Sequence, residues 1–134
     1  MMEKSGRRLH PGGLPEPAGL YSHAMKAGGF LFLCGQSGRD SDGSLALDLE
    51  GQLKQTFRNI GAILASEGLT FRSVVKFTTY VVDKGHIAEF HQVRSGIYEE
   101  VFPSGDYPPN TLLVVTQLAV AELLVEVETV AFAG

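Results

Sequence analysis

Two glutamates near the end of the 134-residue chain have the type and spacing that best fit chemistry. Glu126 and Glu128 are two residues apart, so on a β-strand both side chains point to the same face. That face also carries Leu124, Val130 and Phe132. A carboxylate among apolar neighbours is partly desolvated, which favours its protonated form and suits it to acid or base catalysis near neutral pH. A solvated face without a chemical role is the alternative, and the residues alone leave both open.

The single cysteine, Cys34, ends an apolar stretch and directly precedes Gly35. A lone cysteine usually serves as a small buried apolar side chain. A nucleophilic thiolate needs a neighbouring histidine or a helix N-terminus to lower its pKa, and no local spacing supplies one. Gly35 has no side chain, so a ligand can approach the backbone closely there and the amide can bind an anion.

The histidines show no spacing typical of a metal site, so we expect neither a metal nor a cofactor. They are His10, His23, His86 and His91. We expect the last two on the polar surface of a helix. The Gly-x-x-Gly run at 35–38 is too short for a nucleotide-binding fingerprint and is followed by a loop.

Charge and length exclude several classes of protein. The net charge of −4 and pI of about 5.5 argue against binding nucleic acid, which requires clustered Lys and Arg. No apolar run approaches the roughly 18 residues of a membrane span, so we expect none. The lone cysteine and the lack of a signal-peptide pattern predict a cytoplasmic protein.

The charged fraction points to an oligomer. Charged residues make up 19% of the chain, against roughly 25% in ordinary globular domains. A small monomer has proportionately more surface and should carry more charge than average. We therefore expect part of the surface to be covered by another copy of the chain.

The residue pattern divides the chain into an arm and a single domain. The Gly- and Pro-rich leader predicts a flexible arm over residues 1–18, followed by one domain over residues 19–134. In the domain, a Gly-Gly turn predicts a hairpin, and apolar side chains at helical spacing predict two helices. The expected elements are a hairpin over 21–34, a helix from Leu49 to Leu64 with Asp48 as N-cap and Gly68 as its stop, a strand over 74–82, a helix over 87–101, and strands over 111–118 and 123–132 joined by a short turn. The predicted order is ββαβαββ.

This order places two helices against one mixed sheet, and two helices cover only one of its faces. The run from Leu112 to Val115 is apolar at successive positions, so both faces of that strand are apolar. Identical faces of neighbouring subunits are the simplest cover for the face without helices.

Order and motifs together resemble the RidA family, also called YjgF or L-PSP, over roughly residues 19–133. The motifs that carry the resemblance are Gly19-Leu20-Tyr21, Leu33-Cys34-Gly35-Gln36, Gln55 to Asn59, Val74 to Thr78, Tyr98 to Phe102 and Val125 to Glu128. The resemblance implies an α+β, chorismate-mutase-like ββαβαββ subunit that assembles as a homotrimer, with clefts between subunits. It also implies hydrolysis of reactive enamines and imines, such as 2-aminoacrylate, to a keto acid and ammonia.

The resemblance assigns roles to particular residues. Glu126 matches the glutamate that holds the hydrolytic water. The matching substrate-binding positions are Tyr21, Cys34, Gly35, Asn110 and Leu112. Active members carry an arginine that pairs with the substrate carboxylate, and here that position is Asn110, whose amide has no charge. Arg39 or Arg94 is a candidate to replace it.

Three functions follow from this mixed pattern. The first is a deaminase acting on a small imine or enamine in an inter-subunit cleft, with activity on 2-imino acids in doubt at Asn110. The second is a non-catalytic trimer that binds a small metabolite or a partner protein. The third, an endoribonuclease, fits the acidic charge balance least.

Overall fold

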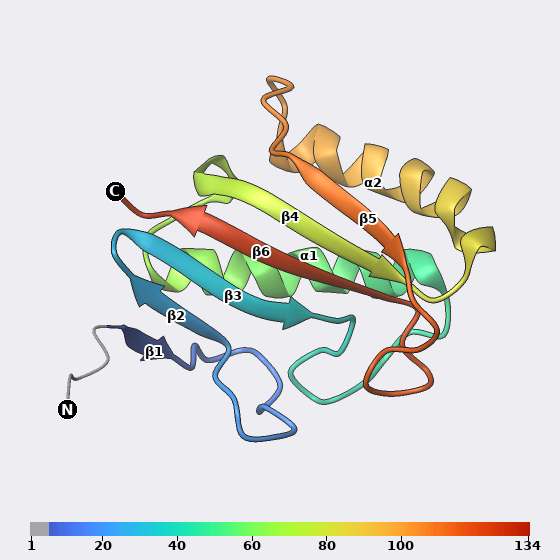
Figure 1. Ribbon diagram of the computed structural model, residues 1–134, viewed down its shortest axis with the longest axis horizontal. Coiled ribbons are helices and arrows are strands. Elements are labelled where there is room, and N and C mark those ends of the chain that lie inside the picture. The colour runs from blue at the N-terminus through green and yellow to red at the C-terminus, as the bar shows by residue number, and fades with distance from the viewer. Residues whose placement is uncertain (1–5) are drawn as a thin grey trace.

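The computed structural model describes residues 6–134 as one mixed sheet with two α-helices packed on one of its faces (Figure 1). The elements are β1 (Arg7–Leu9), β2 (Ala24–Ala27), β3 (Phe30–Gln36), α1 (Leu49–Ser66), β4 (Val74–Val81), α2 (Ile87–Val101), β5 (Asn110–Val114) and β6 (Val125–Phe132), with short 3₁₀ turns at Phe71–Ser73 and Lys84–His86. The α+β class and the two helices on one face are confirmed. No helix in this described part of the chain is long and apolar enough to span a membrane.

The predicted flexible arm is wrong over part of its length. Residues 1–5 lie outside the described part of the chain, but Arg7–Leu9 form β1, which pairs antiparallel with β2. Leu9 is only 7% exposed, and Leu14 is buried in the same core. The sequence pattern did not predict this strand, because three residues are too few to show a period. The Pro and Gly residues from Pro11 to Pro17 that follow it favoured an arm instead.

The hairpin and the first helix form where the sequence predicts them. Gly28 and Gly29 have φ values of +58° and +83°, the left-handed conformation that a tight hairpin turn requires. The Asp48 side chain accepts a hydrogen bond from the amide of Gly51 and caps α1. Gly68, at φ +70°, stops the helix at its other end.

The short turn predicted between the last two strands is wrong, because residues 115–124 separate them. In the sheet order β1-β2-β3-β6-β4-β5, strand β6 lies between β3 and β4, and β5 pairs parallel with β4 at the edge. The strand predicted to reach residue 118 ends at Val114, and residues 115–124 cross over β4 to the central position. This central position places Glu126 between two strands that are distant in the sequence.

One face of the sheet is covered by α1 and α2, and the other, which we call the open face, is uncovered in a single chain. Phe30, Phe32 and Phe132 form an aromatic cluster there, with ring centroids 5.1 to 6.1 Å apart. Phe32 and Phe132 are 47% and 49% exposed. Along β5, Leu112 packs against the core and Leu113 is exposed. An apolar face without helices is therefore present, as the sequence predicts.

Candidate functional site

Glu126 lies on the open face in the middle of the sheet. Val125 and Val127 point into the core on either side of it, which turns Glu126 and Glu128 to the open face together. Tyr80 on β4 is its register partner, and Gly35 on β3 lies on its other side. A Cβ atom placed on Gly35 would lie 2.7 Å from Cδ of Glu126. Glycine at position 35 therefore makes the space that the carboxylate occupies.

The surroundings of Glu126 make it a carboxylate suited to proton transfer. Burial raises the pKa of Glu126, and the negative charge of Glu128 raises it further. Within residues 6–134, no ion pair or hydrogen bond engages its carboxylate oxygens. A half-buried carboxyl with free oxygens and a raised pKa can bind a water molecule and exchange protons with it.

Cys34 lies beside this carboxylate and is a thiol rather than a thiolate. Its Sγ accepts a hydrogen bond of 3.2 Å from Nε2 of Gln36. Burial, followed by the charge of Glu126, raises the pKa of Cys34 to about 11. A neutral thiol of this kind is a poor nucleophile.

We therefore expect slow alkylation of Cys34. At pH 7.5, iodoacetamide should modify it about 100-fold more slowly than it modifies a free thiol, because the thiolate fraction falls with each unit of raised pKa. Intact-protein mass spectrometry against a glutathione reference measures both rates. A rate equal to that of glutathione would contradict the protonated assignment.

Tyr21 and Cys34 line a common groove of about 710 Å³. The Tyr21 Oη accepts a hydrogen bond of 3.2 Å from the amide of Ala18. Arg8 and His10 at the end of β1 line the same groove. Sequence reasoning missed these two residues because it treated their segment as an arm.

Asn110 and Leu112 do not join this groove in one chain. Oδ1 of Asn110 accepts a hydrogen bond of 2.7 Å from the Thr79 hydroxyl. The strand register pairs Asn110 with Phe77, whose side chain is in the helix-covered core, and Leu112 packs against that core. Both therefore lie on β5, across β4 from Glu126 and turned to the other side of the sheet.

Neither candidate replacement for the missing arginine reaches the groove in one chain. Arg39 donates a hydrogen bond of 3.0 Å to the carbonyl of Gly43. The guanidinium of Arg94 on α2 lies over the rings of Phe90 and Tyr98, on the helix side of the sheet. Neither lines the groove that holds Tyr21.

Comparison with known proteins identifies the family. The family model described as Endoribonuclease L-PSP matches residues 13–133. A RutC family protein of Pyrococcus horikoshii is 35% identical over 120 residues, covering 88% of this chain and 90% of that protein. The chain belongs to the RidA (YjgF/L-PSP) family. The human protein named 2-iminobutanoate/2-iminopropanoate deaminase is 33% identical to this RidA-family chain over 122 residues, covering 90% of this chain and 85% of the human one.

Solved structures agree with the RidA-family fold. A Rid family protein of Yersinia pestis superimposes with a TM-score of 0.84 at 30% identity, covering 95% of this chain and 98% of that one. RidA from an Antarctic Psychrobacter gives a TM-score of 0.83 at 28% identity, covering 94% and 98%. The predicted fold is therefore confirmed.

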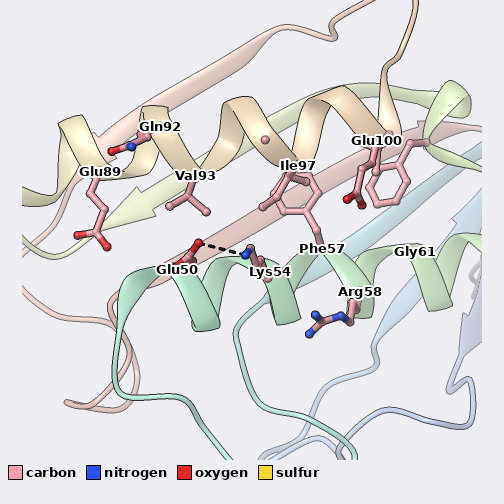
Figure 2. Close-up of a pocket in the computed structure, with 13 residues that line it drawn as sticks. Glu50, Lys54, Phe57, Arg58, Gly61, Glu89, Gln92, Val93, Ile97 and Glu100 are labelled. Atoms are coloured by element: carbon pink, nitrogen blue, oxygen red, sulfur yellow. Dashed lines mark hydrogen bonds and ion pairs between the residues drawn. The ribbon is translucent and has the colours of Figure 1, made fainter.

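A second and larger hollow in this RidA-family chain lies away from Glu126. It is a groove of about 880 Å³ between α1 and α2, and an ion pair of 3.0 Å between Lys54 and Glu50 lies along its wall (Figure 2). It contains none of the residues that the sequence predicts for the site. We therefore choose the candidate site by the positions of Glu126 and Tyr21 and not by the volume of the groove.

A metal centre has no obvious place in the described part. No group of three or more His, Cys, Asp or Glu side chains within residues 6–134 is arranged to hold an ion. His91 is exposed on α2, as expected, and His86 directly precedes that helix. The absence of a cofactor from the reaction stays a prediction.

Proposed function

We propose that this RidA-family protein hydrolyses a small reactive imine or enamine to a carbonyl compound and ammonia. The observation that carries the proposal is the carboxylate of Glu126, which lies beside the backbone of Gly35, is half-buried, has a raised pKa and has no hydrogen-bond or ionic partner among residues 6–134. The names of related proteins support the reaction class, because the human relative is called an iminobutanoate and iminopropanoate deaminase. Ammonia release from imines generated in situ tests it, and a rate no higher than that in buffer refutes it.

The proposed chemistry needs one carboxylate and one water molecule. The Glu126 carboxylate accepts a hydrogen bond from the water and takes its proton as the oxygen attacks the carbon of the C=N bond. The C=N π electrons move to nitrogen, which takes this proton from Glu126, so a carbinolamine forms and the carboxylate is restored. Transfer of the hydroxyl proton to Glu126 and of a proton from Glu126 to nitrogen then breaks the C–N bond and releases ammonia. A raised pKa lets one group perform both transfers near neutral pH.

We propose that the working unit is the homotrimer and that its clefts lie between subunits. Tyr21, Cys34 and Gly35 surround the groove and carboxylate of one chain, whereas Asn110 and Leu112 lie across β4 from them. These two sets of residues can contact one substrate only if Asn110 and Leu112 of a neighbouring chain lie beside Tyr21, Cys34 and Gly35 of the first chain. The uncovered aromatic open face supports such an assembly.

The pH profile of the reaction should depend on Glu128. Groups on three strands face Glu126: Cys34 on β3, Tyr80 on β4 and Glu128 on its own strand. Of these, Glu128 raises the pKa of Glu126 by its charge. In Glu128→Gln the pKa of Glu126 falls, so the acid limb of the kcat/KM profile should move to lower pH. Steady-state rates between pH 4 and 9 measure the shift. An acid limb that does not move would show that Glu126 is not the general base.

A non-catalytic binding module is the second candidate, and Asn110 favours it. The oxygen of Asn110 is held by Thr79, and the residue carries no charge for a substrate carboxylate. A metabolite that binds only the folded chain must raise its apparent stability. A thermal-shift panel of small metabolites therefore separates the candidates, since binding without ammonia release from any imine would favour the module.

A further inference from the structure

Strand β1 sends its two arginines to opposite sides of the sheet. Arg7 forms an ion pair with Glu67 at the end of α1, and Leu9 enters the core on the same side. Arg8 pairs in register with Met25, which pairs with Phe32 on the open face. Alternation along the strand therefore turns Arg8 to the open face, where it lines the groove with Tyr21.

The guanidinium of Arg8 is free for a ligand. Among residues 6–134, no carboxylate forms an ion pair with Arg8, and its side chain donates no hydrogen bond to the protein. Its neighbour Arg7 has such a partner. A planar guanidinium without a protein partner is suited to a two-pronged contact with a carboxylate.

One buried polar atom close to the same wall is also without a partner. His10 lines the groove, and its ring packs edge-to-face on His23 at 6.1 Å between centroids. His23 is only 6% exposed, and its buried Nδ1 has no hydrogen-bond partner in the described part of the chain. Buried polar atoms are nearly always hydrogen-bonded, so an unpaired one beside a groove favours a polar guest or a water there.

We propose that Arg8 binds a carboxylate of the substrate in the groove that Tyr21 and Cys34 also line, which rests on the deaminase function proposed above. Strand β1 is three strand positions from β6, about 14 Å across the sheet, and the register row of Arg8 meets β6 at Val130, four residues and about 14 Å along the strand from Glu126. One carboxylate adjacent to the C=N carbon is too short to span from the Glu126 water to Arg8. The substrate class is therefore an elongated imine with a second, distal carboxylate.

Binding of a non-reacting dicarboxylate tests Arg8 without turnover. We expect suberate, an eight-carbon dicarboxylate titrated calorimetrically, to bind Arg8→Gln about tenfold more weakly than the unaltered protein, because a charge-assisted contact is lost. Arg7→Gln is the matched control, since it removes the same charge one residue away on the other side of the sheet. Thermal melts of both variants monitor folding. Suberate binding that is absent, or equal in all three proteins, overturns the proposal.

Turnover then separates Arg8 from the catalytic proposal. Imines generated from L-2-aminosuberate and L-2-aminooctanoate have the same eight-carbon chain and differ in the distal carboxylate. In Arg8→Gln, KM should rise about tenfold for the imine of 2-aminosuberate and stay unchanged for the imine of 2-aminooctanoate, with kcat preserved for both. An active protein whose KM values do not change in Arg8→Gln refutes the Arg8 assignment alone. A protein that binds suberate through Arg8 but releases no ammonia refutes the deaminase function alone.

Discussion

Replacing Glu126 by glutamine should lower kcat/KM for imine hydrolysis by about 10²- to 10⁴-fold, the usual contribution of a positioned general base. Glutamine occupies nearly the same space beside Gly35 and still binds water through its amide, but it cannot take the proton. Ammonia release at saturating and limiting substrate measures the loss. A variant that retains most of the native rate would show that Glu126 is not the base.

The same substitution should stabilise the fold at neutral pH, which distinguishes lost chemistry from lost structure. Burial raises the pKa of Glu126 in the folded chain, so its charged form is disfavoured there. The carboxyl's contribution to stability is present below its unfolded pKa and is lost as the pH rises through its folded pKa. Glu126→Gln should therefore melt a few degrees higher than the native protein at pH 7.5, with no difference at acidic pH where both are neutral. Glu99→Gln, at an exposed position on α2, is the control for removal of a charge, because Glu99 does not act on the pKa of Glu126.

Patterns within a single element were enough to predict most of the fold. The apolar stripe of α1, its Asp48 cap and the Gly28-Gly29 turn each act over a few residues, and the structure has all three. Strand β1 was not predictable in this way. Its three residues form a strand because β2 offers them hydrogen bonds, and this partner lies beyond the range of any local pattern.

The site shows the same limit more clearly. The common face of Glu126 and Glu128 follows from strand alternation and was predictable. The contact of Glu126 with Gly35 depends on β6 pairing beside β3, and the presence of Arg8 in the groove depends on β1 pairing with β2. The resemblance to the family placed Asn110 in a shared site. In one chain, strand order puts it on the far side of β4.

The open face should be the surface through which the chain assembles. In a single chain it presents the rings of Phe30, Phe32 and Phe132 together, each more than a third exposed. Exposed apolar clusters of this kind are uncommon in monomers and are usual where subunits meet. The low charge content of 19% is consistent with a covered surface.

A single charge in this aromatic cluster should therefore dissociate the assembly. Phe30→Glu places a carboxylate between the other two rings and outside the groove, where neighbouring copies would bury it without a partner at a cost of several kcal/mol per ion. We expect sedimentation equilibrium to give three times the 14.4 kDa of one chain for the native protein and close to one chain for the variant. Phe30 is 38% exposed in one chain, so the subunit itself should stay folded.

Gln92→Glu adds the same charge at an exposed position on α2, on the helix side of the sheet, and should leave the mass unchanged. If the site is completed by a neighbouring chain, ammonia release must fall with the trimer in Phe30→Glu and persist in Gln92→Glu. A monomeric variant with full activity would place the whole site within one chain, and the function would then depend on Glu126, Tyr21 and Arg8 without Asn110. A native protein that is already monomeric would contradict the proposed trimer, because its aromatic open face would then be exposed to water.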